Sequence, residues 1–149
     1  MLSAKFVQMI ETHADQIARS VCGLVRRDPK TARIASLPEA ELRSHCQEIL
    51  QNLGHWLTAS PEEAVARRFE ALGELRRREK VPLAESVHAV HLLKEKMLDY
   101  IRDQGLAQTS VDLYAEEELE HQVGCFFDSA VYHLIRGYEH APQPETALP

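Results

Sequence analysis

Apolar residues recur every three or four positions along almost the whole chain. This spacing places them on one face of an α-helix, whereas a half-buried strand would alternate apolar and polar residues at every second position. No segment shows a convincing strand pattern. The pattern predicts an all-α fold, either an antiparallel bundle of about five helices or a globin-like packing with wider crossing angles.

The first three helices follow from this periodicity and from their start and stop signals. The first is expected over about residues 3 to 27 and stops before Pro29, because proline cannot continue a helix. Two S-x-x-E sequences, beginning at Ser36 and Ser60, predict capping boxes that open the second and third helices. The inward face of the first helix is expected to carry Phe6, Ile10, His13, Ile17, Val21, Leu24 and Val25.

The last two helices are the clearest signals in the chain. Pro82 marks the start of the fourth helix, and Gln104-Gly105 supplies a C-terminal stop. Thr109 or Ser110 opens the fifth, which runs to about His140 and is the longest. An apolar face of that length suits both a core and a partner.

Composition fits one compact domain. A chain of 149 residues with 44% apolar content can bury a core, but it is too short for two domains. The domain is expected over residues 1–140. Residues 141–149 contain three prolines and no periodicity, which is typical of a disordered tail or the start of a linker.

Net charge and hydropathy exclude two classes of partner. The formal charge of −6 argues against nucleic-acid binding, which needs a basic surface to neutralise phosphates. The one basic cluster, Arg76 to Arg78, is expected to satisfy the carbonyls at a helix end and to offset the helix dipole there. No apolar run approaches the roughly 20 residues that span a bilayer, and no signal-peptide pattern opens the chain, so a cytoplasmic location is expected.

The three cysteines, Cys22, Cys46 and Cys125, are widely spaced and include no C-x-x-C pair. Each lies within a helical apolar pattern. They are therefore expected to be reduced thiols in the core.

The order of these features resembles the N-terminal sensor domain of RsbRD-type proteins, the RsbT co-antagonists of bacterial stress signalling. The resemblance extends over most of the chain. It rests on Arg27-Asp28-Pro29 at the end of the first helix, on Leu37-Pro38-Glu39-Ala40-Glu41-Leu42, and on Arg76 to Lys94 with Val81-Pro82-Leu83 at its centre.

The resemblance implies a non-enzymatic regulatory domain that passes a signal by helix rearrangement to a partner or an output domain. In that family the helical domain usually precedes a sulfate-transporter/anti-sigma-antagonist (STAS) domain or another module such as a histidine kinase. The 149 residues are expected to hold only the helical domain, either as a stand-alone sensor or as one excised from a longer protein. No cofactor is expected. A ligand pocket or coupling surface is expected between the fourth and fifth helices, formed by His91, Lys94, Met97 and Phe126.

A homodimer is also predicted, from the length of the fifth helix. Phe127, Val131 and Ile135 lie beside its inward stripe and widen its apolar surface. The opposite interpretation, that this broad stripe is entirely core, is equally open.

Eight histidines raise two alternatives. His88 and His91 share one face of the fourth helix, and His121 lies four residues before Cys125 on the fifth, so a haem- or metal-binding sensor is one alternative. The other is a histidine phosphotransfer domain, since His91-Leu92-Leu93-Lys94 has the H-x-L-K spacing of such domains. Glu95 stands where they carry glycine.

No catalytic motif accompanies these patterns. The chain contains no G-x-S-x-G, no P-loop and no metalloprotease H-E-x-x-H sequence. Catalysis is therefore not expected.

Overall fold

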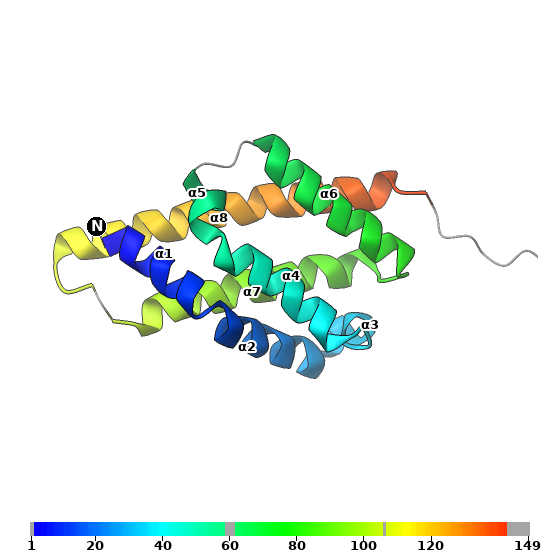
Figure 1. The fold of residues 1–149 in the computed structure, drawn as a ribbon, viewed down its shortest axis with the longest axis horizontal. Helices are drawn as coiled ribbons and strands as arrows, with labels where there is room; N and C mark the ends of the chain where they lie inside the picture. Colours follow the sequence, from blue (N-terminus) through cyan, green and yellow to red (C-terminus); the bar gives the residue numbers. More distant parts are fainter. Residues whose placement is uncertain (1, 59–61, 106, 143–149) are drawn as a thin grey trace, which may run out of the picture.

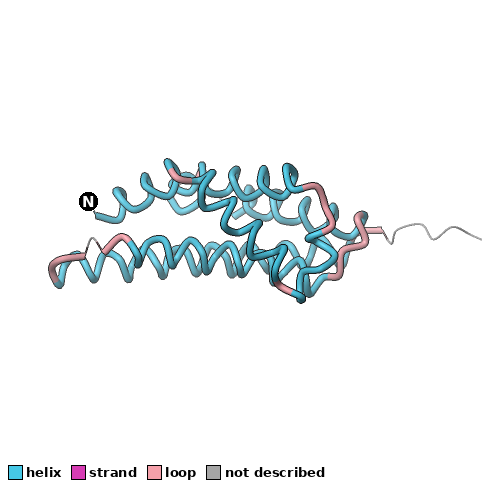
Figure 2. Tube along the Cα trace, turned by 90° about the horizontal axis from the view of Figure 1, so that it is seen from below, coloured by secondary structure: helices cyan, strands magenta, loops and turns pink. Residues whose placement is uncertain are grey.

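The computed structural model describes residues 2–58, 62–105 and 107–142, which are helical over most of their length and contain no strand (Figures 1 and 2). The all-α prediction is confirmed. The elements, in chain order, are α1 (Leu2–Thr12), α2 (Ala14–Arg27), the 3-10 helix η1 (Pro29–Thr31), α3 (Ala32–Ala35), α4 (Glu39–Gln51), α5 (Leu53–Thr58), α6 (Glu62–Arg78), α7 (Leu83–Asp103) and α8 (Ser110–His140).

The first two predicted helices are each divided by a bend. At His13 the backbone leaves helical geometry (φ −101°, ψ 21°), yet His13 N still donates to Met9 O and Ile17 N to His13 O. Helices α1 and α2 are thus one bent rod. His13 is exposed rather than inward, because its Nδ1 lies 2.9 Å from Met9 O at the bend. Asn52 divides α4 from α5 in the same way, with its amide donating to Glu48 O.

The capping box predicted at Ser36 is wrong. Ser36 lies at the end of α3, where its Oγ donates to Arg33 O and accepts from the Arg33 guanidinium, so it is not free to cap α4. Glu39 instead pairs with Arg26 of α2 at 3.0 Å. The other predicted capping box begins at Ser60, which lies outside the described residues.

The remaining boundaries agree with the sequence signals. Helix α2 ends before Asp28, whose side chain accepts from Lys30 N and opens η1. Helix α8 begins after Thr109, whose hydroxyl oxygen accepts from Asp112 N. Gly105 follows α7 with φ +60°, a conformation that glycine adopts without strain. Helix α8 ends at His140, and residues 143–149 of the predicted tail lie outside the described residues.

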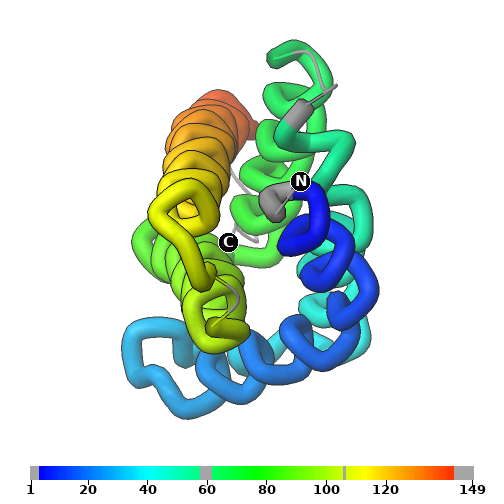
Figure 3. The backbone as a smooth tube through the Cα atoms, turned by 90° about the vertical axis from the view of Figure 1, so that its left-hand side faces the viewer, coloured from blue at the N-terminus to red at the C-terminus, as the bar shows by residue number. Residues whose placement is uncertain are grey.

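The helices form two halves. Within the N-terminal half, α1 to α5, α4 packs on α2, and α1 packs on both α4 and α5. Within the C-terminal half, α6 to α8, helix α8 packs on both α6 and α7. Figure 3 looks along the molecule, with the blue and cyan N-terminal helices to the right and below and α7 and α8 to the left. The halves meet mainly through α2 and α7.

Two glycines bring α6 and α8 into backbone contact. A Cβ added to Gly73 would lie 2.2 Å from Leu134 O, and one added to Gly137 would lie 2.1 Å from Glu70 O. Real Cβ atoms do not approach backbone atoms this closely. Helices α6 and α8 can therefore cross at this distance only because both positions lack a side chain.

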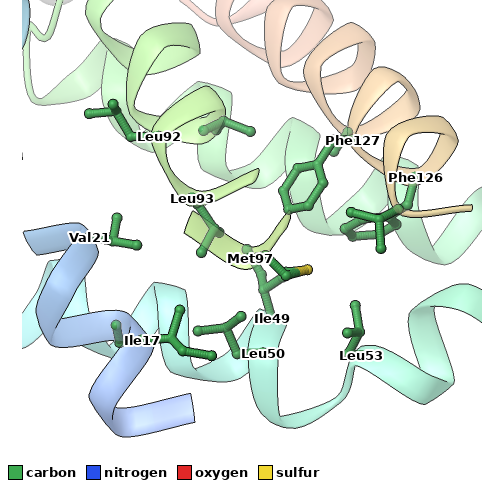
Figure 4. Packing of buried hydrophobic residues seen from close by; sticks show 14 of the residues in the cluster. Ile17, Val21, Ile49, Leu50, Leu53, Leu92, Leu93, Met97, Phe126 and Phe127 are labelled. Carbon is green, nitrogen blue, oxygen red and sulfur yellow. The ribbon is translucent and has the colours of Figure 1, made fainter. Parts of the chain in front are cut away.

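A single apolar core joins the halves. Met97 of α7 is fully buried at its centre, near Ile49 of α4 and Phe127 of α8 (Figure 4). Aromatic rings extend this core toward α5, since Phe126 contacts both Phe127 and Trp56.

Candidate functional site

A central cavity of about 60 Å³ lies between the two halves and is lined by residues of α2, α3, α4, α6, α7 and α8. Most of its wall is aliphatic, with Val25, Ile34, Leu72 and Val90 among the lining residues. One water molecule needs roughly 10–15 Å³ of such space, so the cavity has room for a molecule of a few heavy atoms. It is partly open to the surface but less so than the other described pockets, of which the two that α8 lines are the most open.

Small side chains on facing helices leave this space. Cys22 and Cys46 line the cavity from α2 and α4, and Ser86 and Ala89 line it from α7. Burial raises the pKa of the Cys22 thiol and raises that of Cys46 to about 12. Both thiols are therefore uncharged near neutral pH and poor nucleophiles. The expectation of reduced core thiols is confirmed for Cys22, holds in part for Cys46, which is half-buried against the core, and is wrong for Cys125, which is exposed.

Charged side chains connect α4 to α6 along one edge of the cavity, and two of them, His45 and Arg76, also line it. We call this set the ion-pair seam. Helix α4 does not pack its backbone closely against α6, so these long side chains span the space between the two helices. The seam consists of Glu41, His45 and Glu48 on α4, Arg68 and Arg76 on α6, and Glu79 just after α6.

Arg76 is the buried cation of the seam, with 6% of its surface exposed. Its Nη1 lies 2.6 Å from Glu79 Oε1 and 3.7 Å from Glu41 Oε1. The prediction that Arg76 satisfies helix-end carbonyls is wrong, because these two carboxylates hold its guanidinium. Its neighbour Arg77 does bond a carbonyl, that of Tyr138 on α8, and also lies over the Tyr138 ring.

Arg68 holds the other end of the seam. Its Nε and Nη2 each donate to one carboxylate oxygen of Glu48, both at 3.1 Å. Its Nη2 also lies 3.2 Å from His45 Nδ1. Because a guanidinium has only donors, His45 Nδ1 must accept this bond, which requires a neutral imidazole protonated at Nε2.

Two residues of the ion-pair seam, His45 and Glu41, have shifted pKa values. Burial lowers the pKa of His45, and the positive charges of Arg76 and Arg68 lower it further. Burial raises the pKa of Glu41, and the like charge of Glu79 adds to that increase. Protonated His45 and ionised Glu41 are therefore both disfavoured in the folded protein.

We expect acid to weaken the fold through His45. Its folded pKa lies below the usual value near 6.5, so in the window between them the unfolded chain binds more protons and stability falls as pH falls. The wild-type free energy of unfolding should therefore drop more between pH 7 and 5.5 than that of His45→Gln, whose amide oxygen can still accept from Arg68. Urea unfolding at the two pH values measures the difference. Glu41 acts in the opposite direction but is present in both proteins.

The matched control for this experiment is His91→Gln, which removes an exposed histidine of α7 outside the seam. It should keep the wild-type pH dependence. If His45→Gln and the wild type lose equal stability on acidification, the assignment to His45 is wrong.

The four residues predicted to form a ligand pocket do not converge. Met97 is fully buried in the core, Phe126 lines a groove with Trp56, Lys94 lines a different groove between α7 and α8, and His91 is exposed outside all the described pockets. They do not form one common pocket in this structure. A role of any of them in coupling stays a prediction.

Two of the histidines proposed as haem or metal ligands, His88 and His121, contact different residues and not each other. His88 Nε2 is 2.7 Å from Asp28 Oδ2, and this contact helps to lower the pKa of Asp28, after the larger effect of the Lys30 N–H. His121 Nε2 is 3.6 Å from Cys125 Sγ. Within the residues that the structure describes, no three His, Cys, Asp or Glu side chains are grouped to hold a metal ion. The central cavity is also too small for a porphyrin.

The predicted dimer surface is partly wrong. Phe127 is 1% exposed and points into the core, because α8 is covered on that side by neighbouring helices. Val131 packs against the core and Ile135 is half-buried, so neither forms an exposed apolar surface. The large apolar side chains that α8 does expose are Val111, Leu113, Tyr114 and Tyr132. Dimerisation itself stays a prediction.

None of the helices in the described part of the chain is both long and apolar enough to cross a membrane.

Sequence reasoning missed both the cavity and the seam. Glu41 and His45 lie four residues apart and Arg76 and Glu79 three apart, which are spacings of neighbours on a helix. Such pairs are common on solvated surfaces, so the spacing alone could not show that they face each other across a gap.

One comparison with known proteins gives a match. The model of a family described as the RsbT co-antagonist protein rsbRD N-terminal domain matches residues 14–143. Neither the curated proteins nor the solved structures contain a match to this chain.

Proposed function

The chain belongs to the RsbT co-antagonist protein RsbRD N-terminal domain family, a family of regulatory signalling domains, and from this we propose that it is a sensor domain that passes a stress signal to a partner by moving helix α4 relative to α6. The proposed mechanism is non-covalent and needs no cofactor.

The observation that carries this proposal is the contrast between two helix contacts. Helices α6 and α8 are in backbone contact at Gly73 and Gly137, and such a contact leaves little freedom. Helices α4 and α6 are joined instead by the ion-pair seam, whose long side chains can re-pair over a range of spacings. The N-terminal half can therefore shift while α6 and α8 stay together.

A sensor needs two packings of similar free energy, and a signal changes their populations only by its difference in affinity for the two. The charges of the ion-pair seam could keep two spacings of α4 and α6 similar in free energy. Glu41 and Glu79 share the single cation of Arg76, so the like charge of the two carboxylates opposes the attraction that closes the seam. The α4–α6 spacing in this structure thus reflects both the attraction of the two carboxylates to Arg76 and their repulsion from each other.

We propose that the partner is a STAS-type or kinase-type signalling protein. This rests on the family, whose domains work with signalling partners, and on the STAS and kinase modules that the resemblance to RsbRD-type proteins implies. Homodimerisation through α8 remains part of the proposal, with Val111 and Tyr114 replacing the buried Phe127 as its apolar contacts.

Distance measurements between spin labels test the proposed movement. Spin labels are attached to cysteines introduced at Ser44 and Glu74, which are both exposed, so that they report the spacing of α4 and α6. The background variant is Cys125→Ser, which removes the exposed native thiol. Purified STAS-domain and kinase proteins from the same organism are then added. We expect one of them to bind and to change the α4–α6 distance distribution.

The matched control pairs Glu74 with Asp128, which reports α6 and α8. This distance should stay constant, since the glycine crossing fixes it. A complex that leaves the α4–α6 distance unchanged would show that helix movement is not the mechanism. Failure of every STAS and kinase protein to bind would show that the partner class is wrong.

A further inference from the structure

We propose that the central cavity is a binding site for a small, uncharged, apolar molecule of a few heavy atoms, of the size of a dissolved gas or a short hydrocarbon. The proposal deepens the sensor function above and rests on it for its biological meaning. The binding itself does not depend on a partner.

The size of the cavity limits the ligand. A volume of about 60 Å³ exceeds the need of one water molecule but is too small for a metabolite with a ring and a charged group. The cavity also lies where the N-terminal half faces α6 and α7, so anything that fills it would support the present spacing of these helices.

The mostly aliphatic wall disfavours a charged or strongly hydrogen-bonding ligand. The polar side chains on the wall already have partners: Ser86 Oγ donates to Pro82 O, Arg76 donates to Glu79, and His45 accepts from Arg68. The two thiols are neutral and only weak hydrogen-bonding groups. A water molecule or an anion would therefore find few polar partners on this wall, whereas an apolar molecule needs none.

A ligand bound in the central cavity would also affect the ion-pair seam. Leu72 and Arg76 lie on one helix four residues apart and both line the cavity, and His45 and Ile49 repeat this arrangement on α4. A ligand that packs against Leu72 and Ile49 fixes the two helix faces that also carry the seam. Binding would thus favour the closed α4–α6 spacing by its difference in affinity for the two packings.

Xenon is a suitable probe, because it is apolar, uncharged and monatomic. The chain with labelled methyl groups is placed under increasing xenon pressure and followed by NMR. We expect saturable shifts of the cavity methyl groups of Val90 and Leu134. The methyl groups of exposed Val111 should show only a small linear change.

Variants locate the site. Cys46→Leu places a larger side chain in the cavity and should abolish the saturable shifts, whereas Cys125→Leu makes the same change at an exposed position and should keep them. Ala89→Leu fills the cavity from α7 and replaces Cys46→Leu if that variant does not fold. The xenon-dependent rise in melting temperature should disappear with the same variants.

The absence of saturable shifts in the wild type, or their survival in both filled variants, would overturn the proposal. These measurements use the isolated chain. A negative result would therefore not contradict the proposed movement of α4 relative to α6 on partner binding. Conversely, xenon binding without any effect on the affinity for a partner would confirm the site and separate it from the sensor function.

Discussion

Gly137→Ala is expected to destabilise the protein by about 3 kcal/mol or more, since overpacking of this kind costs roughly 1–3 kcal/mol and more where the neighbours cannot move. The new methyl group would lie 2.1 Å from Glu70 O and 2.6 Å from Glu70 Cα. These are backbone atoms of a helix, which cannot move aside as a flexible side chain can. The helices would have to separate and lose packing along the interface of α6 and α8. Urea unfolding measures the loss.

The control is Gly124→Ala on the same helix, where nothing lies within 4 Å of the added Cβ. Alanine is the better helix former, so this variant should gain up to about 1 kcal/mol. Gly73→Ala should resemble Gly137→Ala, because its Cβ would meet Leu134 O and Tyr138 N. A Gly137→Ala protein as stable as the wild type would show that the two helices do not cross at this distance.

Arg76→Met is expected to cost about 3 kcal/mol, at the lower end of the roughly 3–5 kcal/mol lost when one partner of a buried ion pair is removed. The lower end applies because Glu41 keeps about a third of its side chain exposed. Methionine retains much of the apolar volume of arginine, so the loss reports the charge. Without Arg76, the carboxylates of Glu41 and Glu79 face each other without a cation.

Two further variants isolate this effect. Arg78→Met removes an exposed charge at the same end of α6 and should change stability by no more than about 0.5 kcal/mol. Adding Glu41→Gln to Arg76→Met removes the repulsion and should recover part of the loss. If Arg76→Met and Arg78→Met are equally stable, Arg76 does not hold the seam together.

The long helices could be predicted from the sequence because their signals are local. Periodic apolar positions, Pro29, Thr109 and Gly105 act within a few residues of the boundary they set, and each boundary is found where expected. The bends at His13 and Asn52 left no such signal. In both, a polar side chain meets the carbonyl of the residue four positions earlier, and many helices carry such residues without bending.

The candidate site could not be predicted because it depends on how distant segments meet. The sequence marks Cys22 and Cys46 as inward residues, but a cavity arises only where small side chains of α2, α4 and α7 coincide. Arg76 was assigned to a helix end because two more arginines follow it. Its actual partners include Glu41, which is 35 residues away, and no local rule selects that pair.

The glycine crossing lies near one end of α8, three residues before His140. At about 1.5 Å per residue, the helix extends about 39 Å from Gly137 back to Val111. Because α6 and α8 stay together at the crossing, a movement of this pair by about 5° as one body about Gly137 would carry the exposed Val111 through about 3 Å, whereas His140 would move less than about 1 Å.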